Sequence, residues 1–424
     1  MLDNGPVVID PSGSDVHGEG ERIRAAGPVA RVELPGQVLA WSVTGYQAAR
    51  QLLADPRLSK DPRRHWLAYR DGKIGEDFPL IGWVLMENLT TTYGDDHSRL
   101  RRLTAKAFTQ RRVESLRPKI EQTVADLLDE LAAVPPGEVV DLKARFAHPL
   151  PSRVICDLFG VPEQERAQIL RGGEVNVDTT ISPEESAANV EQWMRDLHAF
   201  AEAKRSNPGD DLTTDLISAQ EDDGSKLSES ELMGTLHLML ATGTEPVMNL
   251  LANAVRALLT HPEQLELVRS GKVAWADVVE ETLRAEAPVA HLPFRFATED
   301  IEIAGVTIAK GDPVLMNFAA MGRDPQVHGE TAAEFDILRA EKEHLSFGYG
   351  AYRCIGFPLA QMEAMIALPA LFERFPDLNL AVPADQLRPQ VTFIMNGLHS
   401  LPVRLSAATG SVSAPQSASA AAGR

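Results

Sequence analysis

The chain is poor in cysteine, with only Cys156 and Cys354 among 424 residues. Two cysteines far apart in the sequence give no disulfide framework, which favours a reducing cytoplasm. The sequence also lacks any apolar run of the roughly 18 residues needed to span a bilayer, and its first residues lack a basic-then-apolar signal. Basic residues are also fewer than acidic ones, with 41 Lys and Arg against 60 Asp and Glu, so the formal net charge is −19. A negative charge of this size argues against a nucleic-acid partner. We therefore expect a cytoplasmic protein that is neither secreted nor anchored in a membrane.

The chain also lacks a linker and an internal repeat. No Pro/Gly-rich or polar segment divides it, so residues 1–406 are predicted to form one large domain, and 44% hydrophobic residues suffice for a large core. The remaining residues, 407–424, are rich in Ser, Ala and Gly and are predicted to be disordered.

Most of the predicted secondary structure is helical. A β-hairpin is predicted over residues 29–43, with its turn at Pro35-Gly36. The longest predicted helix begins near Ser228, which forms a capping box with Glu231, and runs to about Leu259. Residues 61–92 read as a long loop with small helices. Further helices are predicted at 46–53, 96–109, 113–133, 142–159, 162–171, 183–204 and 280–285, and strand-like alternation occurs at 300–308 and 391–405.

One cysteine lies in a glycine-rich loop, FGYGAYRCIG, which spans residues 347–356 and precedes an apolar helical stretch. Such a loop lets backbone N–H groups turn toward the sulfur, and a helix N-terminus adds positive potential, so the thiolate that binds iron is stabilised. The alternative is an inert buried cysteine, as we expect for Cys156. The order Phe-x-x-Gly-x-x-x-Cys-x-Gly resembles the heme-ligand loop of the cytochrome P450 family. The resemblance implies that Cys354 ligates iron and that the cofactor is bordered by Phe347, Gly348 and Gly356.

The resemblance extends over residues 29–405 and implies a mainly α, triangular cytochrome P450 fold with a small β-rich lobe. Residues 61–66 and Thr92-Tyr93-Gly94 are similar to P450s of streptomycete secondary metabolism. The cofactor would be heme b (iron protoporphyrin IX). The reaction would be insertion of one oxygen atom into an apolar small molecule, such as a polyketide, macrolide, steroid or terpenoid-like compound.

A Glu-x-x-Arg motif at Glu281 and Arg284 places both side chains on one face of a helix. By itself it indicates an ordinary surface ion pair. In the P450 family this pair, with a third arginine, locks the segment beneath the heme, and Arg339 matches that arginine by position. The resemblance therefore assigns Glu281 and Arg284 to folding and heme retention.

The two heme propionates are anions that need neutralising if they are partly buried. His97 and Arg101 lie four apart on one predicted helix and resemble the propionate-binding residues of the family, as does Arg295. A solvated basic helix face is the alternative for the first two. The family usually has histidine two residues before the cysteine, where this chain has Tyr352, which can donate a hydrogen bond but carries no positive charge.

The long helix departs from the family pattern Ala/Gly-Gly-x-Asp/Glu-Thr, because the chain reads TGTEP over residues 242–246. Gly243 and Glu245 match, but Pro246 replaces the threonine whose hydroxyl helps deliver protons during oxygen activation. Proline costs about 3 kcal/mol inside an ordinary helix. Pro246 has three interpretations. It is a tolerated kink, or it indicates that protons come from another group, namely Thr242, Thr244, a substrate hydroxyl or water. The third interpretation is that the heme pocket works without productive splitting of oxygen.

Substrate contacts are predicted only by resemblance. The roof of the pocket falls on residues that include Trp83, Leu85, Met86 and Leu89, while His291 and Met395 match segments that reach the substrate. Surface packing is the alternative for each of them.

Electrons are expected from NAD(P)H through a ferredoxin and its reductase. The chain contains no Gly-x-Gly-x-x-Gly module for a flavin or nicotinamide and no second set of cysteines for an iron–sulfur cluster. A monomer with a basic docking face is expected, formed by Arg102, Lys106, Arg111, Arg112 and Arg353. Two other functions stay open: a redox-neutral heme cyclase or isomerase, suggested by Pro246, and a heme sensor or carrier.

Overall fold

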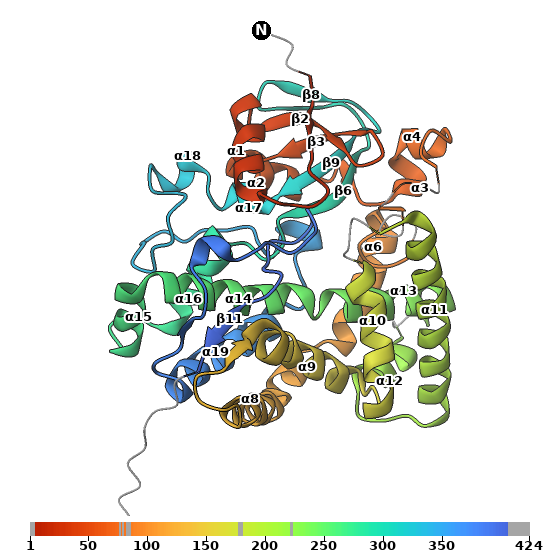
Figure 1. The fold of residues 1–424 in the computed structure, drawn as a ribbon. Helices are drawn as coiled ribbons and strands as arrows, with labels where there is room; N and C mark the ends of the chain where they lie inside the picture. Colours follow the sequence, from red (N-terminus) through yellow and green to blue (C-terminus); the bar gives the residue numbers. More distant parts are fainter. Residues whose placement is uncertain are drawn as a thin grey trace, which may run out of the picture.

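The computed structural model describes residues 5–405 apart from 76–77, 79, 82–85, 177–180 and 221–223. It consists of a large helical body with a β-rich lobe on one side, where most strands gather (Figure 1). The predicted disordered tail, 407–424, lies outside the described residues. Among the residues that are described, no helix is both long and apolar enough to cross a membrane.

The helices of the first half are α1 (Val16–Ala26), α2 (Tyr46–Ala54), α3 (Pro62–His65), α4 (Leu67–Arg70), α6 (Gly94–Ala107), α7 (Gln110–Ser115), α8 (Arg117–Ala132), the π-turn η1 (Lys143–Ala147), α9 (Pro149–Phe159), the 3₁₀ turn η2 (Glu163–Glu165), α10 (Arg166–Asn176) and α11 (Pro183–Ser206). Those of the second half are α12 (Leu212–Ser218), α13 (Glu229–Thr242), α14 (Glu245–Thr260), α15 (Pro262–Arg269), α16 (Trp275–Ala285), α17 (Phe318–Met321), α18 (Pro325–His328), the 3₁₀ turns η3 (Gly350–Tyr352) and η4 (Ala384–Gln386), and α19 (Phe357–Arg374).

Within the described residues, three sheets accompany the helices. The largest has the order β1-β2-β3-β9-β6-β4, formed by Val7–Val8, Val29–Leu34, Val38–Val43, Pro313–Asn317, His291–Ala297 and Leu58–Ser59. A second sheet has the order β10-β11-β5, formed by Asn379–Leu380, Pro402–Arg404 and Val139–Asp141, and β7 (Ile301–Ile303) pairs with β8 (Val306–Ile308). The predicted hairpin at 29–43 is confirmed as β2 and β3. The strand predicted at 391–405 is wrong for most of its length, since only Pro402–Arg404 forms one.

Helix α14 crosses the middle of the molecule and packs against α16 and α19 (Figure 1). Twelve of its 16 residues are buried, so it is a core helix enclosed on nearly every side. It belongs to the largest apolar cluster, which α8, α9 and α19 also share. Cys156 on α9 is fully buried in this cluster, as predicted, and burial raises the pKa of its thiol to about 12.

The long helix predicted from Ser228 to Leu259 is two helices in the structure. Its start is confirmed, because Ser228 and Glu231 form a reciprocal capping box. The helix then ends at Thr242 and a new one begins at Glu245. Periodicity did not reveal the break, because the apolar pattern continues through it.

The break explains how the chain accommodates its proline. Pro246 is the second residue of α14. Proline in a first helical turn lacks only an N–H that would have no partner within the helix. The helix-interior cost of about 3 kcal/mol therefore does not apply at this position.

The Glu281–Arg284 pair lies in the interior, not on the surface. Both side chains are 0% exposed, and Arg284 binds the Glu281 carboxylate through Nε at 2.7 Å and Nη2 at 2.6 Å. Arg284 also donates to the backbone carbonyls of Gly322, Ala332 and Glu334, each at 2.7 Å. Arg339 Nε lies 3.6 Å from Glu281 Oε1, so the predicted third arginine is confirmed in this network.

Candidate active site

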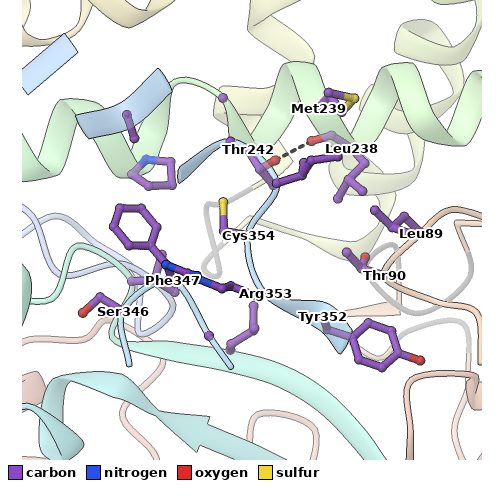
Figure 2. Close-up of a pocket in the computed structure, with 18 of the residues that line it drawn as sticks. Leu89, Thr90, Leu238, Met239, Thr242, Ser346, Phe347, Tyr352, Arg353 and Cys354 are labelled. Carbon is purple, nitrogen blue, oxygen red and sulfur yellow. Dashed lines mark hydrogen bonds between the residues drawn. The ribbon is translucent and has the colours of Figure 1, made fainter. Parts of the chain in front are cut away.

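A cavity of about 300 Å³ lies where the α13–α14 junction, β6, α6 and the loop before α19 meet. Its walls are mainly apolar and are formed by residues that include Leu89, Ile155, Leu238, Met239, Val247, Leu250, Val289 and Leu359. Figure 2 shows the Cys354 sulfur pointing toward the helix that carries Thr242 and Leu238. Thiol and helix junction thus border the same cavity.

Two left-handed glycines shape the loop before α19. Gly348 and Gly350 have φ values of 71° and 72°, a region that favours glycine. A Cβ on Gly350 would lie 2.8 Å from the carbonyl oxygen of Leu53, so the loop needs glycine there for space as well. The backbone N–H of Cys354 donates to the carbonyl of Phe347 at 2.8 Å and closes the turn.

Opposing effects act on the Cys354 thiol. Its side chain is exposed because it borders the cavity, yet the surrounding protein still desolvates it, and this desolvation raises its pKa. The backbone N–H groups of Gly356 and Phe357 act in the other direction and lower that pKa, as do the charges of Arg101 and Arg353. These donors favour the thiolate, as the glycine-rich loop and helix start predict.

Basic side chains surround the ring of Tyr352. The His97 ring lies 3.9 Å from it between centroids, and Arg295 Cζ lies 5.0 Å from its centroid. Lys60 Nζ lies 5.8 Å from the same centroid. The Tyr352 hydroxyl donates to the carbonyl of Thr92 at 2.7 Å.

Burial perturbs these basic groups. It lowers the pKa of Arg295 to about 10. Burial and the Arg295 charge lower the pKa of Lys60 to about 7. Burial, with the charges of Arg101, Lys60 and Arg295, lowers the pKa of His97 to about 4.

The cluster fits the propionate end of a heme. Arg295 Nε and His97 Nε2 are buried and have no hydrogen-bond partner among the described residues. In that part of the chain, no carboxylate lies within 4 Å of Lys60, Arg101 or Arg295. Buried cations need anions, and two propionates beside a porphyrin that faces Cys354 would supply them.

The two threonines at the helix break differ in position. Thr242 lines the cavity, and its hydroxyl donates to the carbonyl of Leu238 at 2.8 Å, the dashed line of Figure 2. Thr244 is buried, is not among the residues that line the cavity, and its Oγ1 has no partner among the described residues. Glu245 is also buried and accepts a hydrogen bond from Gln390 Nε2 at 3.2 Å.

Most residues singled out in the sequence are brought together around this cavity. Its lining includes Leu89, Arg101, Thr242, Gly243, Pro246, Arg295, Phe347, Gly348, Tyr352, Cys354, Gly356 and Met395. His97 adjoins it through Tyr352. Met86 is half-buried and is not one of the lining residues, and Trp83 and Leu85 lie outside the described residues.

His291, predicted to lie near the substrate, is not among the residues that line the cavity. His291 begins β6, its side chain is 0% exposed, and it lies 3.7 Å from Glu19 Oε1 on α1. Its ring packs edge-on against Phe393, and burial lowers its pKa to about 3. Its side chain packs against α1 and Phe393 and is not part of the cavity lining, which position in the sequence alone could not reveal.

Two ionisable residues in the lining, Glu363 and Lys60, were not predicted as site residues. Glu363 on α19 is 1% exposed, its Oε2 has no partner among the described residues, and burial raises its pKa well above the usual value. An acidic residue inside an apolar helical stretch was a usable signal. Lys60 gave none, because a lysine beside Asp61 resembles an exposed charge pair.

Comparisons with known proteins agree with this geometry. A model described as Cytochrome P450 matches residues 276–399. The chain is 55% identical to 2-hydroxy-5-methyl-1-naphthoate 7-hydroxylase of Streptomyces carzinostaticus, over 94% of this chain and 97% of that enzyme. It is 40% identical to 6-deoxyerythronolide B hydroxylase of Saccharopolyspora erythraea, over 90% and 94% of the respective chains.

The fold agrees as well. The solved structure of CYP154A1 from Streptomyces coelicolor A3(2) has a TM-score of 0.89 and 47% identity, covering 94% of this chain and 100% of that one. The predicted mainly α fold with a small β-rich lobe is thereby confirmed. Because both sequence and fold match over nearly the whole length, the chain belongs to the cytochrome P450 family of monooxygenases.

Proposed function

We propose that this chain is a heme-thiolate monooxygenase that binds heme b through Cys354 and inserts one oxygen atom into an apolar small molecule. The observation that carries the proposal is the Cys354 sulfur, which borders an apolar cavity shared with the α13–α14 break. When bound, heme supplies the iron at which dioxygen is activated. Arg101 and Arg295 hold its propionates by charge-assisted hydrogen bonds, and His97 supports them.

The apolar wall above Cys354 selects the substrate class. Leu89, Leu238, Met239 and Met395 offer no charge, so the substrate is held chiefly by burial of its apolar surface. The names of two relatives refer to a naphthoate and to 6-deoxyerythronolide B. A polyketide-derived ring compound therefore fits best among the classes that the sequence suggested.

Proton delivery at this site relies on Thr242. Its hydroxyl is part of the cavity lining, and its oxygen keeps acceptor capacity while it donates to Leu238. Thr244 and Glu245 lie at the start of α14 and are not among the residues that line the cavity. They would therefore transfer protons to the cavity through water or after a small movement. A substrate hydroxyl is a second source, since Pro246 offers none.

A ferredoxin and its reductase would pass electrons from NAD(P)H. The exposed Arg353, adjacent to the iron ligand, and the exposed Arg111 favour an acidic partner at this face. Arg112 is less suited, because it pairs with Asp215 and lies 3.2 Å from Asp210. A docking surface should thus centre on Arg353.

A redox-neutral cyclase or isomerase is the second candidate, and Pro246 is the observation that favours it. The helix start at Glu245 explains why proline is tolerated, but the hydroxyl that oxygen activation commonly uses is still missing at this position. Such an enzyme would convert its substrate without consuming NADPH.

Product formation should be measured with ferredoxin, ferredoxin reductase and NADPH, and again without any reductant, using a panel of polyketide-derived ring compounds that shift the heme absorption. We expect product only in the complete system. Product without reductant would support the redox-neutral enzyme. Heme binding and substrate shifts without turnover in either condition would support a sensor or carrier.

A further inference from the structure

Lys60 is the only buried lysine among the described residues. It is 6% exposed and lines the cavity, yet no acidic side chain in the described part of the chain acts on its charge. By contrast, the half-buried Lys204 lies 2.6 Å from Asp211 Oδ2. Lysine is rarely buried without a partner, because an unpaired charge loses its hydration. Without an anion Lys60 tends to lose its proton, as its lowered pKa of about 7 indicates, and it keeps its charge only beside an anion that the described side chains do not provide.

Strand pairing places Lys60 beside Arg295. β4 and β6 are antiparallel, with Leu58 opposite Ala297 and Ser59 opposite Phe296. The next residues in this register are Lys60 and Arg295, and the Arg295 charge indeed lowers the pKa of Lys60. Two like charges on neighbouring backbones repel each other unless they share an anion.

Tyr352 occupies the place where the P450 pattern has a histidine, and it cannot supply the missing charge. Its hydroxyl is directed to the carbonyl of Thr92, while its ring lies between His97 and the two cations from β4 and β6. The cations beside the Tyr352 ring therefore come from the strand edge and not from residue 352 itself.

We propose that Lys60 is a heme-propionate ligand, which with Arg295 binds a carboxylate of the cofactor and replaces the charge that residue 352 lacks. The inference rests on the proposed heme site. It concerns cofactor positioning, and Lys60 acts on the heme through its ammonium group, not on the substrate.

Lys60→Met tests the proposal by removing the charge while keeping an unbranched apolar stem. Heme transfer from the loaded protein to excess apomyoglobin should become about 10- to 100-fold faster, the usual worth of a charge-assisted hydrogen bond. The reduction potential of the heme should also fall, because a nearby positive charge favours the reduced iron. Lys60→Arg keeps the charge and should leave both quantities close to native.

Lys204→Met is the matched control, since it removes an enclosed lysine outside the cavity and should leave heme transfer and potential unchanged. Tyr352→His in the Lys60→Met background should restore slow heme transfer, because it returns a cation to the loop. Equal transfer rates for native protein and Lys60→Met would overturn the proposal. So would fast transfer in Lys60→Arg, or no rescue by Tyr352→His.

Failure of this inference differs from failure of the proposed function. A native protein that does not bind heme would contradict the proposed function itself. A native protein that binds heme normally, with Lys60→Met indistinguishable from it in both measurements, would contradict only the role of Lys60.

Discussion

Cys354 and Cys156 show how the surroundings of a residue decide its chemistry. Cys156 lies within α9 and Cys354 just before α19, and burial raises the pKa of each thiol. Only Cys354 borders the cavity and has backbone N–H groups directed at its sulfur, whereas Cys156 lies within the apolar cluster. We therefore expect iron to bind Cys354 and not Cys156.

We predict that Cys354→Ala loses the absorption band that the reduced carbon monoxide complex of a heme thiolate gives, while Cys156→Ala keeps it. Removing Cys156 leaves only a small void in the core and should cost about 1 kcal/mol of stability. Difference spectra of the three proteins are the measurement. Loss of the band in Cys156→Ala with retention in Cys354→Ala would mean that the ligand has been misassigned.

At the scale of elements, the junction of α13 and α14 combines a structural and a chemical feature. The helix restarts at Glu245, which makes Pro246 harmless, and Thr242 stands at the end of the preceding helix, facing the cavity. Stability and proton delivery can therefore be altered separately at this junction.

Pro246→Thr should change the free energy of unfolding by less than about 1 kcal/mol, because a first-turn proline is not required there. The added hydroxyl should raise the product formed per NADPH and reduce peroxide. Thr242→Val should do the opposite, lowering product per NADPH several-fold. Product and peroxide per NADPH are the quantities to measure.

Pro262→Thr is a matched control, because Pro262 also occupies the first turn of a helix, α15, and does not line the cavity. It should alter stability by a similar amount and leave coupling unchanged. Tight native coupling that Pro246→Thr lowers would show that Thr242 or the substrate already completes the proton path.

On the scale of the whole molecule, the Glu281–Arg284 network joins the helical body to the segments that approach the heme loop. Arg284 binds backbone carbonyls from 322 to 334, and the N–H of Asp336 donates to Glu281 at 2.8 Å. Each of these partners is far from α16 in sequence. The network thus fixes long-range packing that the local helix could not enforce.

Glu281→Gln should destabilise the protein by about 3–5 kcal/mol, because Arg284 and Arg339 would remain charged in the interior with a neutral partner. Chemical denaturation of the heme-loaded protein measures this. Glu191→Gln, which breaks the exposed Glu191–Arg195 pair, should cost less than about 1 kcal/mol. If both variants lose a similar amount of unfolding free energy, the Glu281 network contributes no more than an ordinary surface ion pair.

Much of the site was readable from the sequence because its parts are local. The loop from Phe347 to Gly356 carries ligand, glycines and helix start within ten residues, and His97 and Arg101 lie one helical turn apart. The capping box at Ser228 likewise depends only on residues three apart. Spacing within one segment determines such chemistry whatever surrounds it.

Only the tertiary structure decided the rest. The α13–α14 break, the inward turn of His291 beside Glu19 and the placement of Lys60 opposite Arg295 each depend on neighbours distant in the chain. Lysine at 60 and tyrosine at 352 are uninformative by themselves. Strand pairing sets Lys60 opposite Arg295, and the turn η3 brings Tyr352 to the same corner. A lysine there loses its hydration and keeps its charge only beside an anion.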